Sequence, residues 1–177
     1  MNATGIVRRI DDLGRVVIPK ESRSTMRIRE GDPLEIFTDA GGEVVFKKYS
    51  PIGELSNYAS QCAEALATAT RLSVAVCDRD HCIAAAGISK KEVLERRVTP
   101  VLEGVMDERR TVVFEDENQL ALEAVNRKMC VAAPIIISGD VSGAVVMLAS
   151  DVSDKPTESD EKLVRVAAAF LSKQLEE

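Results

Sequence analysis

Short runs of β-branched and aromatic residues, separated by polar turns, fill residues 1–50 of the chain. Such runs are typical of strands, and four of them predict strands at Gly5–Ile10, Arg15–Ile18, Leu34–Thr38 and Glu43–Tyr49. Pro19 ends the second run, because proline has no N–H to donate to a strand ladder. Lys20–Met26 fits one or two helical turns, and no longer helical spacing occurs. The pattern predicts an all-β N-terminal domain.

This N-terminal segment is small for a domain that must fold alone. Below about 60 residues a single core is marginal unless disulfides or a metal support it, and residues 1–50 contain no cysteine. Short strands also leave unpaired edges. Association of two copies, with strands of both sharing one core, removes both problems. Size therefore predicts an obligate dimer through residues 1–50.

A domain boundary is expected near Pro51, because the residue before a proline is biased away from helix and a new pattern begins just after it. We interpret residues 51–56 as a linker that leads into a helix, and residues 57–177 as a second domain. The helix carries apolar residues at heptad-like spacing, namely Ile52, Leu55, Ala59, Cys62, Leu66 and Ala69. This stripe either packs on its own domain or joins helices of two protomers, and the spacing favours neither.

The second part of the chain alternates helical and strand-like segments. Strands are predicted at Ser73–Cys77, Cys82–Ala86, Thr111–Glu115, Met129–Ile137 and Val141–Ser150. Helix starts are predicted after the capping residues Ser89, Thr99 and Thr157. Asp116–Lys128 is polar and poorly periodic, which indicates a loop or a loose helix. This order predicts an α+β domain with an antiparallel sheet flanked by helices, and not a doubly wound parallel sheet.

Charge is distributed unevenly between the two parts. The chain has a net charge of −6, yet residues 1–29 hold seven basic groups and three acidic ones. Residues 51–177 hold 14 basic and 21 acidic groups. Nucleic-acid binding depends on the face that meets phosphate, so the basic N-terminal segment indicates double-stranded DNA as a partner. The alternative is a solvated face whose arginines form surface ion pairs with Asp11, Asp12 and Glu21.

Several function classes do not fit the composition. The chain has no tryptophan and only six aromatic residues, which argues against a base-stacking platform for single strands. No apolar run reaches the roughly 18 residues of a membrane span, and the N-terminus lacks a secretory pattern. We therefore expect a cytoplasmic protein with no membrane partner. The four cysteines and the single histidine lack zinc-site spacing, so no metal, cofactor or catalytic group is expected.

Three N-terminal runs carry a resemblance to a known family. They are TGIVRRIDDLGRVVIPKE from Thr4, EGDPLEIF from Glu30 and FKKYSP from Phe46. They resemble the N-terminal domain of the AbrB family of transition-state regulators. The resemblance implies a swapped-hairpin β-barrel dimer for residues 1–50. It also implies that this face binds DNA through Arg8, Arg15 and Arg23.

Other basic residues are secondary candidates for the same DNA-binding face. Arg9 and Lys20 are expected to contact phosphate. The family often has a second arginine after the third one, but this chain has Ser24 there, and Arg27 is expected to compensate. Arginine suits this role because its planar fork binds phosphate or guanine with two hydrogen bonds. A flat basic β-face without a recognition helix predicts tolerant sequence readout that depends on DNA shape.

The resemblance extends to a sporulation-type member of the family and then covers essentially all 177 residues. It implies a GAF-like C-terminal domain, a tetramer held by helices, association with the nucleoid, and activation and repression of forespore genes. An antitoxin-like DNA-binding autorepressor shares the N-terminal fold and is the main alternative. An enzyme of the sensor-fold class would need a clustered acid–base or metal set.

The C-terminal domain leaves two interpretations open. Either a small-molecule effector binds between the sheet and the helices of Ser89–Arg110, or side chains of the domain fill that space. Cys77 and Cys82 flank a short turn and could face each other, which suits core packing better than a redox switch. His81, in the same turn, is expected to face solvent.

Overall fold

The computed structural model describes residues 5–54, 56–115, 119–151 and 154–176. The chain divides into two compact units, Met1–Tyr49 and Ser50–Glu177. Leu55 of the predicted apolar stripe and the start of the predicted loop at Asp116 lie outside the described residues. Among the helices that the structure describes, none combines the length and the apolar character that crossing a bilayer requires.

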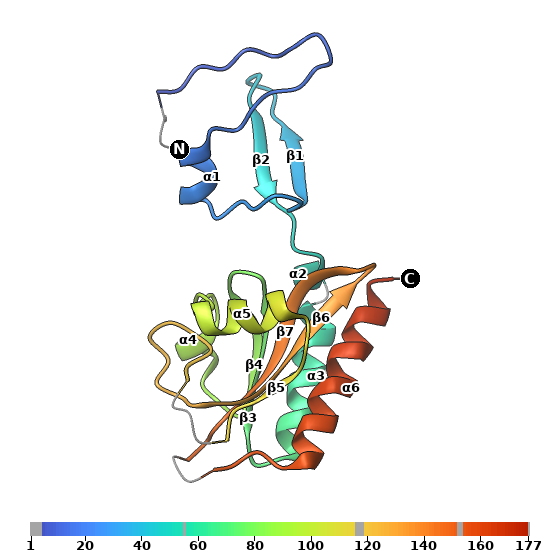
Figure 1. The fold of residues 1–177 in the computed structure, drawn as a ribbon. Coiled ribbons are helices and arrows are strands. Elements are labelled where there is room, and N and C mark those ends of the chain that lie inside the picture. The colour runs from blue at the N-terminus through green and yellow to red at the C-terminus, as the bar shows by residue number, and fades with distance from the viewer. Residues whose placement is uncertain (1–4, 55, 116–118, 152–153, 177) are drawn as a thin grey trace. The chain divides into compact units, whose positions relative to one another are not determined.

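Within residues 5–49, the first unit contains one short helix and one hairpin (Figure 1). Helix α1 spans Lys20–Thr25, and strands β1 (Leu34–Thr38) and β2 (Val44–Lys48) pair in antiparallel register. The hairpin turn closes through a hydrogen bond from the Gly42 N–H to the Asp39 carbonyl at 3.1 Å. These three elements confirm the sequence predictions to within one or two residues.

The predicted strands at Gly5–Ile10 and Arg15–Ile18 do not form in the single chain. That prediction was wrong for one copy, because a strand needs a neighbouring strand to exchange backbone hydrogen bonds. The segment makes only a tight turn, in which the Asp11 N–H donates to the Arg15 carbonyl at 3.0 Å. Apolar side chains that the pattern suggested for a core remain exposed there.

Residues 5–49, all of which the structure describes, contain no buried side chain. Ten large apolar side chains of this unit are exposed, namely Ile6, Val7, Ile10, Leu13, Val16, Val17, Met26, Ile36, Phe37 and Val44. Val7 is 88% exposed. Soluble proteins rarely leave so many large apolar side chains of one short segment exposed to solvent. One copy of this unit therefore lacks the core that a stable domain needs.

The second unit is built on a five-stranded antiparallel sheet in the order β4-β3-β7-β6-β5. The strands are β3 (Ser73–Asp78), β4 (Cys82–Ala86), β5 (Val112–Val113), β6 (Met129–Ile137) and β7 (Asp140–Leu148). The α+β prediction with an antiparallel sheet is confirmed. Strands β6 and β7 are almost fully buried because helices cover both faces of the sheet.

Helices pack on both faces of the sheet (Figure 1). One face is covered by α3 (Ser56–Ala69) and α6 (Glu158–Gln174), with the short α2 (Pro51–Glu54) beside them. The other face is covered by α4 (Lys90–Val93) and α5 (Pro100–Glu108). Ile52, Ala59 and Leu66 of the predicted stripe are buried in the core of this unit, and Ala69 is exposed. Most of the stripe therefore packs on its own domain.

Two of the three predicted helix caps are present. The Leu102 N–H donates to Thr99 Oγ1 at 3.4 Å, and Thr157 and Asp160 form a reciprocal capping box at the start of α6. The helix start predicted after Ser89 is confirmed, since α4 begins at Lys90, but the Ser89 side chain makes no capping hydrogen bond. The Glu92 N–H instead donates to the Ser89 carbonyl at 3.0 Å.

Backbone atoms of β3 lie directly against Gly143 of β7. Gly143 pairs with Asp78, and a Cβ atom added to Gly143 would lie 2.1 Å from the Cys77 carbonyl oxygen. Such a distance is far inside van der Waals contact with backbone that cannot move aside. The centre of the sheet therefore requires glycine at this position.

We expect Gly143→Ala to lower the free energy of unfolding of the C-terminal unit by about 3 kcal/mol, because the methyl group forces two central strands apart. Gly104→Ala is the matched control, since a Cβ there meets no atom within 4 Å and α5 gains a better helix former. Urea unfolding followed by circular dichroism measures both. Equal stability of the two variants would contradict the close approach.

Candidate nucleic-acid interface

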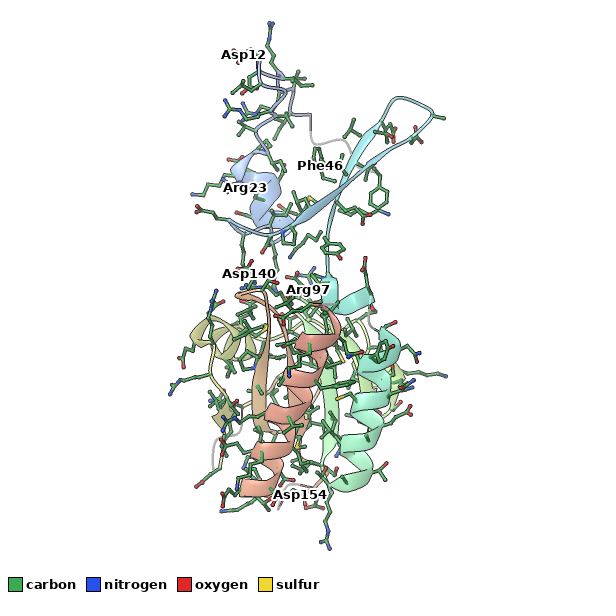
Figure 2. All side chains as sticks on the ribbon, turned by 90° about the vertical axis from the view of Figure 1, so that its right-hand side faces the viewer. Asp12, Arg23, Phe46, Arg97, Asp140 and Asp154 are labelled. Carbon is green, nitrogen blue, oxygen red and sulfur yellow. The ribbon has the colours of Figure 1, made fainter. Side chains whose placement is uncertain are left out.

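All six predicted DNA-binding residues lie in the first unit. Arg8, Arg9 and Arg15 belong to the segment without strand pairing, and Lys20 and Arg23 lie on α1. These five side chains are exposed, and Figure 2 shows Arg23 on its helix. Lys20 and Arg23 are three residues apart, so they lie next to each other on the helix surface. The unit thus presents basic groups to solvent, as phosphate binding requires.

Arg15 forms an ion pair with Asp11 at the turn of the N-terminal segment. Arg15 Nε donates to Asp11 Oδ2 at 2.8 Å. The Arg15 side chain is nevertheless 70% exposed. The contact is one of the surface ion pairs that the alternative of a solvated face predicts, and it leaves the arginine accessible to solvent.

Asp11 also organises the backbone of this turn. Its Oδ1 accepts the Leu13 N–H at 3.0 Å and the Arg15 N–H at 2.8 Å. The backbone N–H and the side chain of Arg15 hold the pKa of Asp11 below its ordinary value, with a smaller contribution from the Leu13 N–H. Asp11 is thus ionised at neutral pH. The sequence pattern indicates Asp11 only as one of three acidic neighbours of the arginines, and gives no sign of its place in the turn.

Arg27 has a structural role besides its charge. The Ile28 N–H donates to the Arg23 carbonyl at 2.8 Å and the Arg27 N–H to the Ser24 carbonyl at 3.2 Å, which is the Schellman ending of α1. Arg27 occupies the left-handed position of this motif with a φ of 51° and is half-buried. Glycine usually fills that position, so the backbone of Arg27 is strained.

Lys48 is a residue of this unit that sequence reasoning missed. Its Nζ donates to the Arg27 carbonyl at 3.0 Å and lies 3.8 Å from Asp32 Oδ2. Asp32 also accepts the Arg29 N–H at 2.8 Å. Lys48 therefore fixes the connection between α1 and the hairpin. The turn sequence around Asp32 was visible, but its lysine partner lies too far along the chain for a local pattern to reveal it.

The space between the sheet and α4 and α5 is occupied by apolar side chains of the protein. Val93, Val98, Leu102, Met106 and Leu122 are all essentially inaccessible to solvent and belong to one packed cluster. Close packing of this kind leaves little room for a ligand. The described residues thus favour the interpretation that the domain fills this space itself.

Cys77 and Cys82 face each other across the β3–β4 hairpin, as the sequence allowed. They pair in register, both are buried, and both are free thiols. A side-chain hydrogen bond with Cys82, together with burial, raises the pKa of Cys77 well above its ordinary value. A protonated, inaccessible thiol is a poor nucleophile, so the pair suits core packing. His81 is half-buried and its backbone bridges to Arg97, so the expectation that it faces solvent was only partly right.

We expect the buried Cys77 thiol to make the C-terminal unit less stable at high pH. The pKa of Cys77 is higher in the folded state than in the unfolded chain. The protonated thiol therefore contributes fully to the free energy of unfolding below the unfolded-state pKa, and this contribution is lost as pH rises above about 8.5. Urea unfolding at about pH 8 and about pH 10 should show a larger loss for the wild-type chain than for Cys77→Ala. Identical losses would contradict the assignment.

Comparison with known proteins matches both units. Residues 54–176 match the family model described as stage V sporulation protein T C-terminal, transcription factor. Residues 7–53 match the model described as antidote-toxin recognition MazE, bacterial antitoxin. The chain is 49% identical to stage V sporulation protein T of Bacillus subtilis over 180 residues, covering 100% of both chains. It is 55% identical to the transition state regulatory protein AbrB of the same organism over 51 residues, covering 29% of this chain and 52% of that protein.

Solved structures resemble the second unit in fold. The GAF domain of an Acinetobacter phosphoenolpyruvate-protein phosphotransferase has a TM-score of 0.57 at 15% identity, covering 68% of this chain and 81% of that one. The GAF domain of Thermosynechococcus elongatus PixJ, in its blue-light absorbing form, has a TM-score of 0.57 at 13% identity, covering 73% and 89%. The predicted GAF-like fold of the C-terminal domain is thereby confirmed, as is the AbrB-like character of the N-terminal unit.

Proposed function

The chain belongs to the stage V sporulation protein T family, and from that membership we propose that it is a double-stranded DNA-binding regulator of forespore genes, activating some and repressing others. In this scheme residues 1–50 bind DNA, residues 51–56 connect, and residues 57–177 form the sensor and oligomerisation domain. The protein acts in the cytoplasm, on the nucleoid. Its C-terminal family model is described as a transcription factor and one of its relatives is a transition state regulator, which supports a regulator and not an enzyme.

The observation that carries the proposal is the coincidence of two exposed surfaces in one unit. Residues 5–49 expose the basic side chains of Arg8, Arg15 and Arg23, and they also expose ten large apolar side chains. Pairing with a second copy would cover the apolar side chains and give the unpaired segment around Arg15 a strand partner. We infer a swapped-hairpin barrel in which guanidinium groups of both copies follow one DNA duplex.

DNA recognition in this scheme depends on phosphate charge and groove shape. Arg8, Arg15 and Arg23 make the main contacts, and Arg9, Lys20 and Arg27 reinforce them. Two copies of residues 1–29 supply 14 basic groups, so even half of them meeting phosphate gives strong salt dependence. Ser24 removes one arginine of the family pattern, and we propose that Arg27 compensates for its charge. Sequence readout is tolerant because no recognition helix enters the groove.

The C-terminal domain is proposed to join two N-terminal dimers into a tetramer. Helices α3 and α6 lie side by side on one face of the sheet (Figure 1). Their outer surfaces expose Val166, at 67%, and Phe170, at 45%, on α6, and Tyr58 on α3. An apolar helix surface of this kind suits helix–helix contact between protomers. An effector remains part of the proposal only as a small molecule of unknown identity that biases this assembly.

An antitoxin-like autorepressor is the second candidate, and the match of residues 7–53 to an antitoxin model favours it. Such a protein uses the same N-terminal fold but ends in a short toxin-binding tail. In this chain, residues 50–177 instead form a compact unit, and residues 54–176 match a family model that is described as a transcription factor. Co-purification of a toxin protein with the chain would support the second candidate.

We expect the full chain to bind forespore promoter duplex DNA with a slope of log affinity against log salt of about −6, which corresponds to about seven phosphates neutralised. Arg15→Ala should weaken binding and make the slope shallower by about 2, because each of two copies loses one phosphate contact. Fluorescence anisotropy across a salt series measures both quantities.

Arg165→Ala is the matched control for Arg15→Ala. Arg165 is an arginine of α6 with a 63% exposed side chain, and it lies in the other unit. Its replacement should leave both affinity and slope unchanged. If the wild-type chain ignores duplex DNA at low salt, the proposed function is wrong.

We expect Val166→Glu to convert the tetramer into dimers, because a buried carboxylate at the helix contact lacks a partner. Val101→Glu places the same charge on α5, on the opposite face of the sheet, and should leave the tetramer intact. Native mass spectrometry of the two variants reads out the assembly. Tetramers in both variants would exclude α6 from the interface.

A further inference from the structure

We propose that Asp11 is a positioning residue for DNA binding, which holds the guanidinium of Arg15 by its Nε–H and leaves the terminal nitrogens free for a phosphate or base. The inference rests on the proposed function, since it assigns a partner to one of its DNA-contacting arginines. The negative charge of Asp11 by itself would weaken DNA binding, because phosphate repels it. The geometry of the turn indicates that orientation of Arg15 outweighs this repulsion.

The hydrogen bonds of Asp11 use its two oxygens for different tasks. Oδ1 accepts the backbone N–H groups of Leu13 and Arg15, at 3.0 and 2.8 Å, and so fixes the carboxylate within the turn. Oδ2, held in place by the same turn, accepts Arg15 Nε at 2.8 Å. The carboxylate is thus a rigid group that orients a long, flexible side chain.

The contact leaves the binding end of Arg15 open. An arginine has five N–H donors, of which the Nε–H is one, and the remaining four lie on the two terminal nitrogens. The side chain is 70% exposed. The guanidinium therefore keeps its terminal edge for two hydrogen bonds to phosphate or to guanine. Orientation before binding saves conformational freedom that DNA would otherwise have to remove.

Stability alone does not account for this pair. Ion pairs between exposed side chains contribute little to folding, and the backbone turn needs only Oδ1. Asp12, the next residue, is also exposed and acidic, and Figure 2 shows it in the same turn. Asp12 therefore provides the control. Its replacement removes a negative charge near the DNA, as replacement of Asp11 does, but leaves the contact that orients Arg15 in place.

The depressed pKa of Asp11 agrees with this geometry, because the Arg15 N–H groups stabilise its ionised form. The carboxylate accordingly keeps its charge throughout the neutral range in which DNA binding is measured. Asparagine at position 11 would retain the Oδ1 acceptor for the backbone turn but would lose the anionic partner of Nε. Asp11→Asn thus separates the turn from the orientation of Arg15.

The test measures the affinity of full-chain variants for promoter duplex DNA. Asp11→Asn and Asp12→Asn are each made in two backgrounds, the wild-type chain and Arg15→Ala. Loss of a negative charge should make Asp12→Asn bind about 2- to 5-fold tighter. Asp11→Asn should instead bind about 5- to 10-fold weaker than Asp12→Asn, a difference that disappears in the Arg15→Ala background. In NMR spectra the Arg15 Nε–H resonance should exchange faster with water in Asp11→Asn, while the Leu13 amide stays protected.

The outcomes separate the inference from the function on which it rests. If Arg15→Ala leaves DNA binding unchanged, the proposed DNA contact itself is wrong. If Arg15→Ala weakens binding but Asp11→Asn and Asp12→Asn strengthen it equally, Arg15 binds DNA and Asp11 does not position it. Loss of the Leu13 amide protection in Asp11→Asn would show that Asp11 acts on the turn as a whole, which also overturns the assignment.

Discussion

Burial of apolar side chains is the constraint on which both units of this chain depend, and each meets it differently. The second unit buries its apolar residues on both faces of one sheet, from Ile52 to Leu171. The first unit has the strand-like composition of a core but buries none of it within residues 5–49. A core enclosed by a segment of that size alone is marginal. This unit therefore needs a partner surface to cover its apolar side chains. The same segment carries the basic residues, so the proposed dimer and the proposed DNA-binding face depend on each other.

The second unit has the GAF-like architecture, but its own side chains fill the space between the sheet and the helices. Its GAF-like sheet and helices are present, yet Leu102, Met106 and Leu122 occupy the layer between the sheet and α5. Gly143 lets β7 approach β3 at the centre of that sheet. The paired thiols of Cys77 and Cys82 lie in the same interior. These features make the unit a rigid scaffold for α3 and α6, whose outer surfaces remain available for assembly.

Charge separates the two units as clearly as burial does. The basic groups of residues 1–29 are carried mostly by exposed side chains, in an otherwise acidic chain. Asp11 engages the Nε–H of Arg15, and the arginine side chain stays exposed to solvent. In the proposed DNA complex, an acidic residue beside the binding face therefore need not weaken it, because its effect depends on which donor of the arginine it occupies.

The sequence by itself determined the elements whose signals are local. The pattern gave Cys82–Ala86 and Met129–Ile137 with the bounds that the structure has, and the cap at Thr157, because side-chain alternation and capping depend on a few neighbouring residues. It also located the basic segment and its arginines. Tertiary structure alone decided what depends on distant partners. The run at Gly5–Ile10 has strand composition but no strand beside it, and Gly143 matters only because β3 lies next to it. Hydrogen bonding and packing between remote segments leave no local pattern, which is why these features needed the fold.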